Sequence, residues 1–275
     1  MDTIIIDGLS FALPLFIIAI GGIYSEKSGI TNLALEGFQG FGAFTGALAA
    51  VLIANALGTD IQNLFYVALL FAMLGGMAFS VIHAVLSIKF KADQVISGVV
   101  INILALALTT FLTTQINALV FGTASDKFQL GVSQRFTIEG LADIPVIGAI
   151  FTNVYPFEVI IVVIAVFAWY LLYKTRYGMR LRACGENPHS VDTAGVDVAK
   201  IRFSAVLVSG LLSGLGGMCF AYSISANFSS SIYMGYGFLA IAALIFGNWR
   251  IVPTLAACLL FGFAKSGGAF IAQSM

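Results

Sequence analysis

The chain has 275 residues; 60% of them are hydrophobic, only 9% are charged, and the formal net charge is zero. A soluble domain carries about 25% charged residues, so this composition predicts a protein that crosses a membrane many times. It excludes a soluble catalytic domain, because no polar stretch is long enough to form one. The three cysteines have neither disulfide nor metal-site spacing, so we expect no bound metal.

Long apolar runs dominate the sequence, and seven of them can cross a hydrocarbon core of about 30 Å. They cover residues 9–24, 33–56, 63–88, 94–118, 156–173, 201–224 and 251–270. A shorter run at 236–247 follows a polar, Gly-rich stretch and predicts a broken or re-entrant helix. We therefore expect an all-α bundle in a single membrane domain over residues 1–275. The acidic N-terminus has no basic residues, so we do not expect a cleavable signal peptide.

Asn32 and Glu36 stand at the start of the second run, whose glycines at 37, 40, 42 and 46 allow either close packing or a break. A carboxylate inside a membrane costs about 2.5–3.5 kcal/mol on insertion scales, so Glu36 suggests a substrate path or a hinge. Capping of a helix at the membrane surface would also explain both residues, Asn32 more readily than Glu36. This segment and the run at 236–247 both look interrupted, a pattern that points to a central binding site.

The fourth run begins with polar residues, and Asp93 is a candidate N-cap. Gln94, Gly98, Ile101 and Asn102 share one helical face. Because buried amides in a membrane need partners, this stripe either faces a pore or joins two helices. His83, just before it, is more typical of a packing residue than of a proton relay.

Two further segments allow alternatives. The loop 119–155 carries charges of both signs, and its apolar part at 141–156 predicts a short hairpin or interfacial helix before Pro156. This loop either contacts an external partner or forms a solvated lid. Gly210 and Gly214 have the small-xxx-small spacing that predicts close helix packing.

The longest charged segment covers residues 175–200. Basic residues in or beside it are Lys174, Arg176, Arg180, Arg182, Lys200 and Arg202. Asn187 can cap a helix, Pro188 suits its first position and Gly195 suits a left-handed end, which predicts a helix at 188–194. Such a short helix is unstable alone in water, so we expect it to dock on another protein. The basic residues predict that this segment is cytoplasmic and that the N-terminus and loop 119–155 are external.

Five segments, in this order, resemble the permease subunits of ATP-binding-cassette (ABC) importers: SEKSGITNLALEG, QVISGVVIN, YGMRLRACGENPHSVDTAGVDV, SGLLSGLGGM and GFLAIAALIFGNW. The similarity covers residues 25–248 and is closest to the nucleoside or simple-sugar branch, related to ribose and branched-chain amino acid permeases. GENPHSVDTAG is its most specific part. Members of this family usually continue beyond the position of the last residue, so we expect either that a terminal helix is missing or that this is a short variant.

The resemblance implies that residues 175–200 form a cytoplasmic coupling loop, which contacts a separate ATPase. The residues expected to make this contact are Arg182, Gly185, Glu186, Asn187, Pro188, Ala194 and Gly195. The implied partners are that ATPase, a second permease in a heterodimer or homodimer, a substrate-binding lipoprotein or periplasmic protein, and membrane lipid, without nucleic acid. ATP and Mg²⁺ would bind the ATPase, so this chain would need no cofactor and catalyse nothing, within the bacterial cytoplasmic membrane.

We therefore expect import of a nucleoside-like solute. The residues expected along its path are Asn32, Glu36, Asn102 and Tyr236 for polar contacts, and Phe38 and Phe246 for stacking on a flat base. Riboflavin, a simple sugar or a branched-chain amino acid are alternatives within the same class. An ion-coupled transporter would need more buried carboxylates than Glu36. An intramembrane enzyme would need paired catalytic groups, whereas His83 and His189 stand alone.

Overall fold

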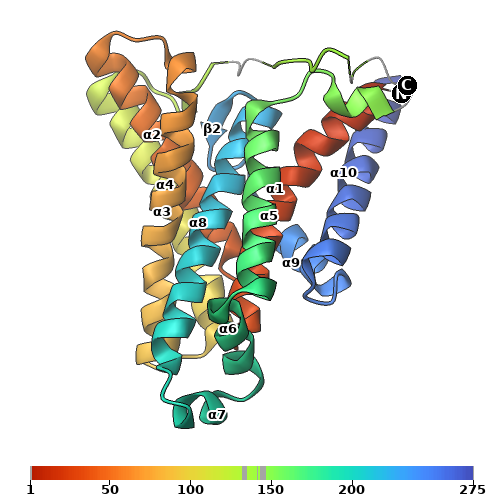
Figure 1. Cartoon of the computed structure of the whole chain (residues 1–275). Helices are drawn as coiled ribbons and strands as arrows, with labels where there is room; N and C mark the ends of the chain where they lie inside the picture. The colour runs from red at the N-terminus through yellow and green to blue at the C-terminus, as the bar shows by residue number, and fades with distance from the viewer. Residues whose placement is uncertain (1, 132–134, 141, 143–146, 275) are drawn as a thin grey trace.

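The apolar runs fold into long helices that form one bundle (Figure 1). The structure is a computed structural model, and it describes residues 2–131, 135–140, 142 and 147–274. In chain order its elements are α1 (Asp2–Lys27), α2 (Leu35–Leu57), a 3₁₀ helix (Ile61–Leu64), α3 (Phe65–Ala84), a π-helical turn (Val85–Lys89), α4 (Gln94–Val120), β1 (Lys127–Gln129), a second 3₁₀ helix (Ile147–Phe151), α5 (Pro156–Lys174), α6 (Arg176–Glu186), α7 (Pro188–Thr193), α8 (Val198–Ile224), β2 (Asn227–Ser229), α9 (Tyr236–Phe246) and α10 (Ile251–Ser274).

The predicted all-α membrane bundle is confirmed. Within the described residues, seven helices are long and apolar enough to span a membrane, and α9 is a shorter apolar helix. These eight elements match the predicted runs. The first helix begins at Asp2 rather than at residue 9, because the isoleucines at 4–6 extend the apolar run.

The predicted interruption in the second run is wrong, since α2 is continuous from Leu35 to Leu57. Its glycines allow close packing instead. A Cβ atom on Gly42 would lie 2.4 Å from the Cα atom of Gly214 in α8, and one on Gly214 would lie 2.2 Å from the carbonyl oxygen of Ala72 in α3. The predicted packing role of Gly214 is therefore confirmed, and α2, α3 and α8 approach one another closely at these positions.

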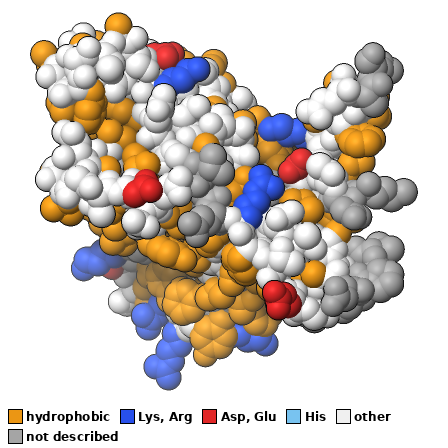
Figure 2. Space-filling view, turned by 90° about the horizontal axis from the view of Figure 1, so that it is seen from above, with side chains coloured by type: hydrophobic (Ala, Val, Ile, Leu, Met, Phe, Trp, Pro, Cys, Tyr) orange, Lys and Arg blue, Asp and Glu red, His pale blue; other side chains and the backbone are white. Residues whose placement is uncertain are grey.

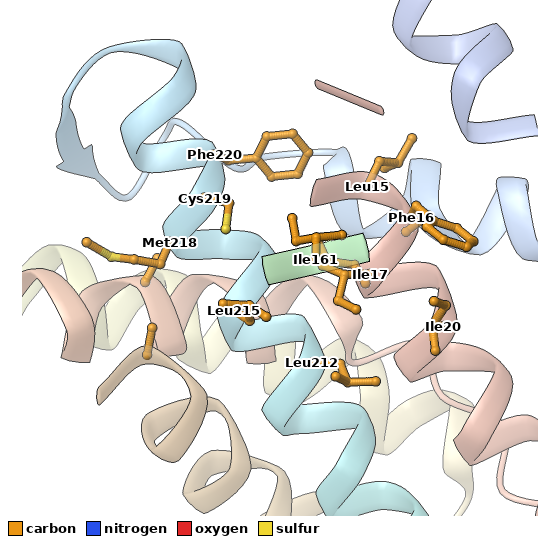
Figure 3. Packing of buried hydrophobic residues seen from close by; sticks show 14 of the residues in the cluster. Leu15, Phe16, Ile17, Ile20, Ile161, Leu212, Leu215, Met218, Cys219 and Phe220 are labelled. Atoms are coloured by element: carbon orange, nitrogen blue, oxygen red, sulfur yellow. The ribbon is translucent and has the colours of Figure 1, made fainter. Parts of the chain in front are cut away.

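The buried apolar core lies mainly between α1 and α8 (Figure 3). Leu15, Ile17 and Ile20 of α1 face Leu215 and Phe220 of α8. Ile161 of α5 lies between the two sets of side chains. Because lipid is as apolar as this core, close van der Waals contact rather than the hydrophobic effect holds such helices together.

The two ends of the bundle differ in charge. We call the end that carries α6 and α7 the α7 end and the opposite end, where α1 begins, the far end (Figure 1). All 13 Lys and Arg residues are described. Ten of them lie in α6 to α8 or at helix ends and turns of the α7 end, whereas Lys127, Arg135 and Lys265 lie elsewhere. The far end shows mixed basic and acidic side chains (Figure 2).

The chain re-enters the bundle after α8. From the far end it passes through β2 and the turn residues 230–235 to the middle of the bundle, where α9 begins (Figure 1). After α9 it turns at Asn248 and Trp249, both in the left-handed region with φ of 49° and 54°. Helix α10 then runs back to the far end beside α1. The predicted re-entrant element is thus confirmed, and Lys265 lies within α10.

The far end also contains elements that were not predicted. β1, from the α4–α5 loop, pairs antiparallel with β2, and Phe128 stands opposite Phe228. Within the range 141–156, where a hairpin or interfacial helix was predicted, the structure has the second 3₁₀ helix, and residues 141 and 143–146 lie outside the described residues. Helix α5 begins at Pro156, as predicted.

Candidate functional site

Helix α7 has the local structure that its sequence predicts. The Asn187 side-chain oxygen accepts a hydrogen bond from the Ser190 backbone N–H at 3.2 Å, and Pro188 is the first helical residue. After Ala194 the chain leaves the helix through Gly195, whose φ of +75° favours glycine. Within α7 only Val191 is buried, so most of this helix and Glu186 before it are exposed.

Helix α6 was not predicted. It begins with Thr175, whose hydroxyl accepts a hydrogen bond from the Gly178 N–H at 3.2 Å, and it buries Gly178, Leu181 and Cys184. Burial raises the pKa of the Cys184 thiol. The spacing of these residues by three is the amphipathic signal that could have revealed the helix. One face of α6 therefore packs against the bundle, and this packing positions α7, which follows directly after α6.

The α6–α7 unit is attached to the turn that joins α1 and α2. A Cβ atom on Gly185 would lie 2.3 Å from the Lys27 carbonyl oxygen, so the two backbones are in contact. Arg202, at the start of α8, donates to the carbonyl oxygen of Ser28 at 3.0 Å and to that of Cys184 at 3.3 Å. A displacement of α7 must therefore act on this turn and on α8.

Arg182 lies on α6 and is not part of the exposed α7 surface. It is half-buried, donates to the Gly178 carbonyl oxygen at 3.3 Å, and lies over the Tyr173 ring at 5.5 Å. It also lines a pocket with Glu26, Glu186 and Trp249. The predicted coupling residues thus fall into two groups, since Arg182 and Gly185 face the bundle and those from Glu186 onward face outward.

We expect Arg202→Gln to loosen α6 from the bundle, because the shorter amide cannot keep both carbonyl contacts. The measurement is the rate of alkylation of Cys184 by N-ethylmaleimide in a chain that carries Cys219→Ala and Cys258→Ala. The rate should rise by about tenfold, which corresponds to one lost charge-assisted bond. Lys200→Gln, an exposed change on the same helix, is the control. An unchanged rate in Arg202→Gln would contradict the attachment.

Glu36 lies at the amino end of the broken helix α9. One of its carboxylate oxygens accepts a hydrogen bond from the Gly235 N–H at 2.8 Å, and Gly237 lies against its backbone. A carboxylate is stabilised there by the helix dipole and the unpaired N–H groups. Glu36 was predicted either to mark a substrate path or hinge at a broken helix or to cap a helix. It bonds to the start of α9, which is the broken helix, and a role in the substrate path stays a prediction.

Asn32 and Asn102 hold the first turn of α2. Asn32 is fully buried, accepts from the Ala34 N–H at 3.0 Å and donates to the Ser209 hydroxyl of α8 at 2.9 Å. Asn102 donates to the Leu33 carbonyl oxygen at 2.8 Å and accepts from the Gly37 N–H at 2.8 Å. Their polar atoms are thus engaged with protein groups, and a role as substrate contacts stays a prediction.

The polar residues at the start of α4 contact neighbouring elements. Gln94 accepts from the Thr31 N–H at 2.6 Å, and Ser97 lies 2.9 Å from a ring nitrogen of His83. His83 is fully buried and its other ring nitrogen lies 3.3 Å from the Thr31 carbonyl oxygen. Of the two alternatives for this stripe, the contact between helices is confirmed, and His83 is the packing residue that was expected.

The aromatic residues predicted for the path are not brought together. Phe38 is fully buried and packs against Phe79 and Ile101, whereas Phe246 is 74% exposed and close to Phe261. The two rings therefore do not form one stacking site. The ring of Tyr236 contacts Phe11 and Phe220.

Two partners of α9 were missed by sequence reasoning. The Tyr236 hydroxyl accepts a hydrogen bond from the Lys265 ammonium group at 2.5 Å. At the other end of α9, the Trp249 indole N–H donates to the Glu26 carboxylate of α1. Carboxylates from α2 and α1 therefore hold the two ends of this short helix. The position of Glu26 directly after the first apolar run was the available signal for this contact.

Comparison with known proteins gives a consistent result. The profile of the family described as branched-chain amino acid transport system / permease component matches residues 4–275. The chain is 42% identical to the guanosine ABC transporter permease protein NupQ of Bacillus subtilis (strain 168), over 94% of this chain and 79% of that protein. It is 39% identical to the nucleoside ABC transporter permease protein NupC of Lactococcus lactis, over 97% of this chain and 82% of that protein.

A second permease of the same Bacillus strain, the guanosine ABC transporter permease protein NupP, is 27% identical over 90% of this chain and 69% of its own length. No solved structure matches the chain. The bundle of spanning helices, the short exposed helix α7 and the match over nearly the whole length agree with one another. The chain is a multi-pass membrane protein and belongs to the family of branched-chain amino acid transport system permease components.

Proposed function

We propose that this chain is the membrane-spanning permease subunit of an ABC importer that carries nucleosides into the cell. The relatives named for guanosine and nucleoside transport support the substrate class. The structural observation that most supports the proposal is the connection of α7 to the rest of the bundle. An exposed helix of six residues is too short to be stable alone, yet it is fixed through Gly185 and Arg202 to the turn before α2. This suits a helix that receives force from a partner.

The route for the solute is supported by polar groups halfway through the bundle. Thr110 of α4 donates to the Ser230 hydroxyl at 2.7 Å, and Thr110, Ser231 and Gly235 are exposed. Non-helical backbone and exposed hydroxyls at this depth are unstable against lipid and need water or protein beside them. We infer that this surface, with Glu36 beside it, lines the path or faces the second permease.

The partners follow from this assignment. The α7 end, with its basic residues, is assigned to the cytoplasm, where α7 and the residues from Glu186 to Gly195 contact the ATPase. ATP and Mg²⁺ belong to that ATPase, and this chain carries no cofactor. The two permease relatives of one Bacillus strain support a heterodimer. A binding protein delivers the nucleoside at the far end, and the membrane is the bacterial cytoplasmic membrane.

The test is ATP hydrolysis by the purified complex in lipid, made from this chain with its ATPase, second permease and binding protein. Adenosine, guanosine, ribose, riboflavin and leucine are added singly with the binding protein. We expect stimulation by the two nucleosides and not by the other solutes. Stimulation by ribose, riboflavin or leucine alone would refute the substrate class, and failure of the chain to associate with any ATPase would refute the transporter class.

A further inference from the structure

One face of α2 follows the re-entrant segment from its middle to the far end. Glu36 contacts Gly235, Gln39 and Gly40 contact Tyr233, and Phe44 contacts Phe228. These α2 residues are spaced by three or four and so lie on one side of the helix. A solute that moves along β2 and residues 230–235 therefore passes the side of α2 that carries Glu36, Gln39 and Phe44.

Gln39 is unusual within that face because one end of its amide has no partner. The side chain is fully buried, and its amide nitrogen donates to the Tyr233 carbonyl oxygen at 3.1 Å. Its carbonyl oxygen makes no hydrogen bond. Thr113 of α4 is also fully buried, with an unpaired hydroxyl, one turn beyond Thr109, which lies 3.1 Å from the Tyr233 hydroxyl. Unpaired buried polar atoms destabilise a fold and therefore call for an explanation.

Aromatic rings surround this position on the side of the far end. Phe44, Phe128, Phe228 and Tyr233 are all buried, and neighbouring ring centroids lie 5.9–6.4 Å apart. We call these four residues the outer aromatic cluster. Planar rings at this spacing offer faces on which a flat heteroaromatic group can stack.

Two of the four rings belong to the β1–β2 ribbon, which is built from parts of the chain distant in sequence. Phe128 and Phe228 are opposite each other in the ribbon. β1 is held to α4 by the Asn117 amide, which donates to the Ser125 and Lys127 carbonyl oxygens at 2.8 and 3.0 Å. A pair of three-residue strands is marginally stable alone, so it can separate without unfolding the helices.

We propose that Gln39 and the outer aromatic cluster form the site that recognises the base of a nucleoside, and that the β1–β2 ribbon closes this site in the present conformation. The inference rests on the proposed function. When the strands separate, the free Gln39 oxygen accepts a hydrogen bond from a ring or exocyclic N–H of the base, and the rings of the cluster stack on the base. The selected ligand is a planar heteroaromatic group that carries an N–H donor.

Gln39→Leu tests the recognition step in the reconstituted complex. Removing an acceptor that pairs with a donor of the base should raise the KM for uptake of adenosine and of guanosine about tenfold. Purine riboside has no N–H on its base, so its KM should stay unchanged. The thermal stability of the permease should change little, because the variant loses the bond to the Tyr233 carbonyl oxygen but also removes an unpaired buried oxygen, and that carbonyl still accepts from the Tyr236 N–H. Gln115→Leu, an exposed change on α4, should alter none of these values.

The outcomes separate this inference from the proposed function. If the unmodified complex carries no nucleoside, the proposed function fails. If it does, and Gln39→Leu leaves all three KM values unchanged or raises them equally, the recognition role is wrong. Gln39→Met, which keeps the length of the side chain, serves as a second variant. If neither variant assembles, Gln39 is required for folding and the inference is overturned.

A disulfide tests the closure. Gln129 and Asn227 are directly opposite in the ribbon, and their side chains are at least partly exposed. With the native cysteines replaced by alanine, the Gln129→Cys and Asn227→Cys pair should form a bridge on oxidation. Uptake should then fall at least about tenfold and recover on reduction, whereas each single cysteine should have no effect. Full uptake by the completely oxidised protein would refute the closure.

Discussion

Gly185→Leu is expected to abolish the coupling between ATP hydrolysis and transport while the membrane bundle remains folded. There is no room for a side chain, since even a Cβ atom would lie 2.3 Å from the Lys27 carbonyl oxygen. The backbone of α6 must move away from the turn before α2, and α7 moves with it. We expect nucleoside-stimulated hydrolysis to fall at least about tenfold, because the displaced helix no longer transmits force to the turn.

The control for this change is Gly267→Leu on α10. Gly267 is also helical, but nothing lies within 4 Å of a Cβ atom placed there. Stimulated hydrolysis and uptake should stay at the level of the unmodified complex. Circular dichroism and recovery of the assembled complex report folding. Normal coupling in a folded Gly185→Leu complex would contradict the attachment of α6 to the α1–α2 turn.

Glu36→Leu is expected to have the second large effect, a loss of uptake of roughly 100-fold. The change removes the charged acceptor of the Gly235 N–H at the amino end of α9, and a hydrogen bond to a charged group contributes up to about 3 kcal/mol. Glu36→Gln keeps an acceptor for the Gly235 N–H but not the charge, so we expect a loss of about tenfold. Initial rates of radiolabelled adenosine uptake by the reconstituted complex measure both.

Glu139→Leu and Glu139→Gln, in the exposed α4–α5 loop, control for the loss of an acidic residue. Binding of the ATPase should persist in all four variants, because Glu36 bonds to the start of α9 and not to α7. Uptake that is equal in Glu36→Leu and in the unmodified complex would show that the position of α9 does not matter for transport.

Local signals explain what could be predicted from the sequence. The spanning helices follow from the length of the apolar runs, and α7 follows from Asn187, Pro188 and Gly195, which act within a few residues. Helix α6 was missed because basic residues are interspersed with the residues of its apolar face, Leu181 and Cys184.

Contacts between distant residues could not be predicted in the same way. The pairing of β1 with β2 joins strands that are far apart in the chain. Each strand has only three residues, which is too short for its sequence pattern to indicate a partner strand. The roles of Asn102 and Glu36 were open because the same side chain can line a path or bond to a neighbouring helix. Only the three-dimensional arrangement shows that Asn102 bonds to the start of α2 and Glu36 to the start of α9.

The most direct test of ATP-driven nucleoside import is uptake of radiolabelled adenosine into proteoliposomes that contain the whole complex, with ATP trapped inside and the binding protein outside. Proton and sodium ionophores are added to collapse ion gradients. We expect uptake that requires internal ATP and external binding protein and that persists with ionophores. Uptake that needs no ATP and disappears with ionophores would contradict the account and establish an ion-coupled transporter instead.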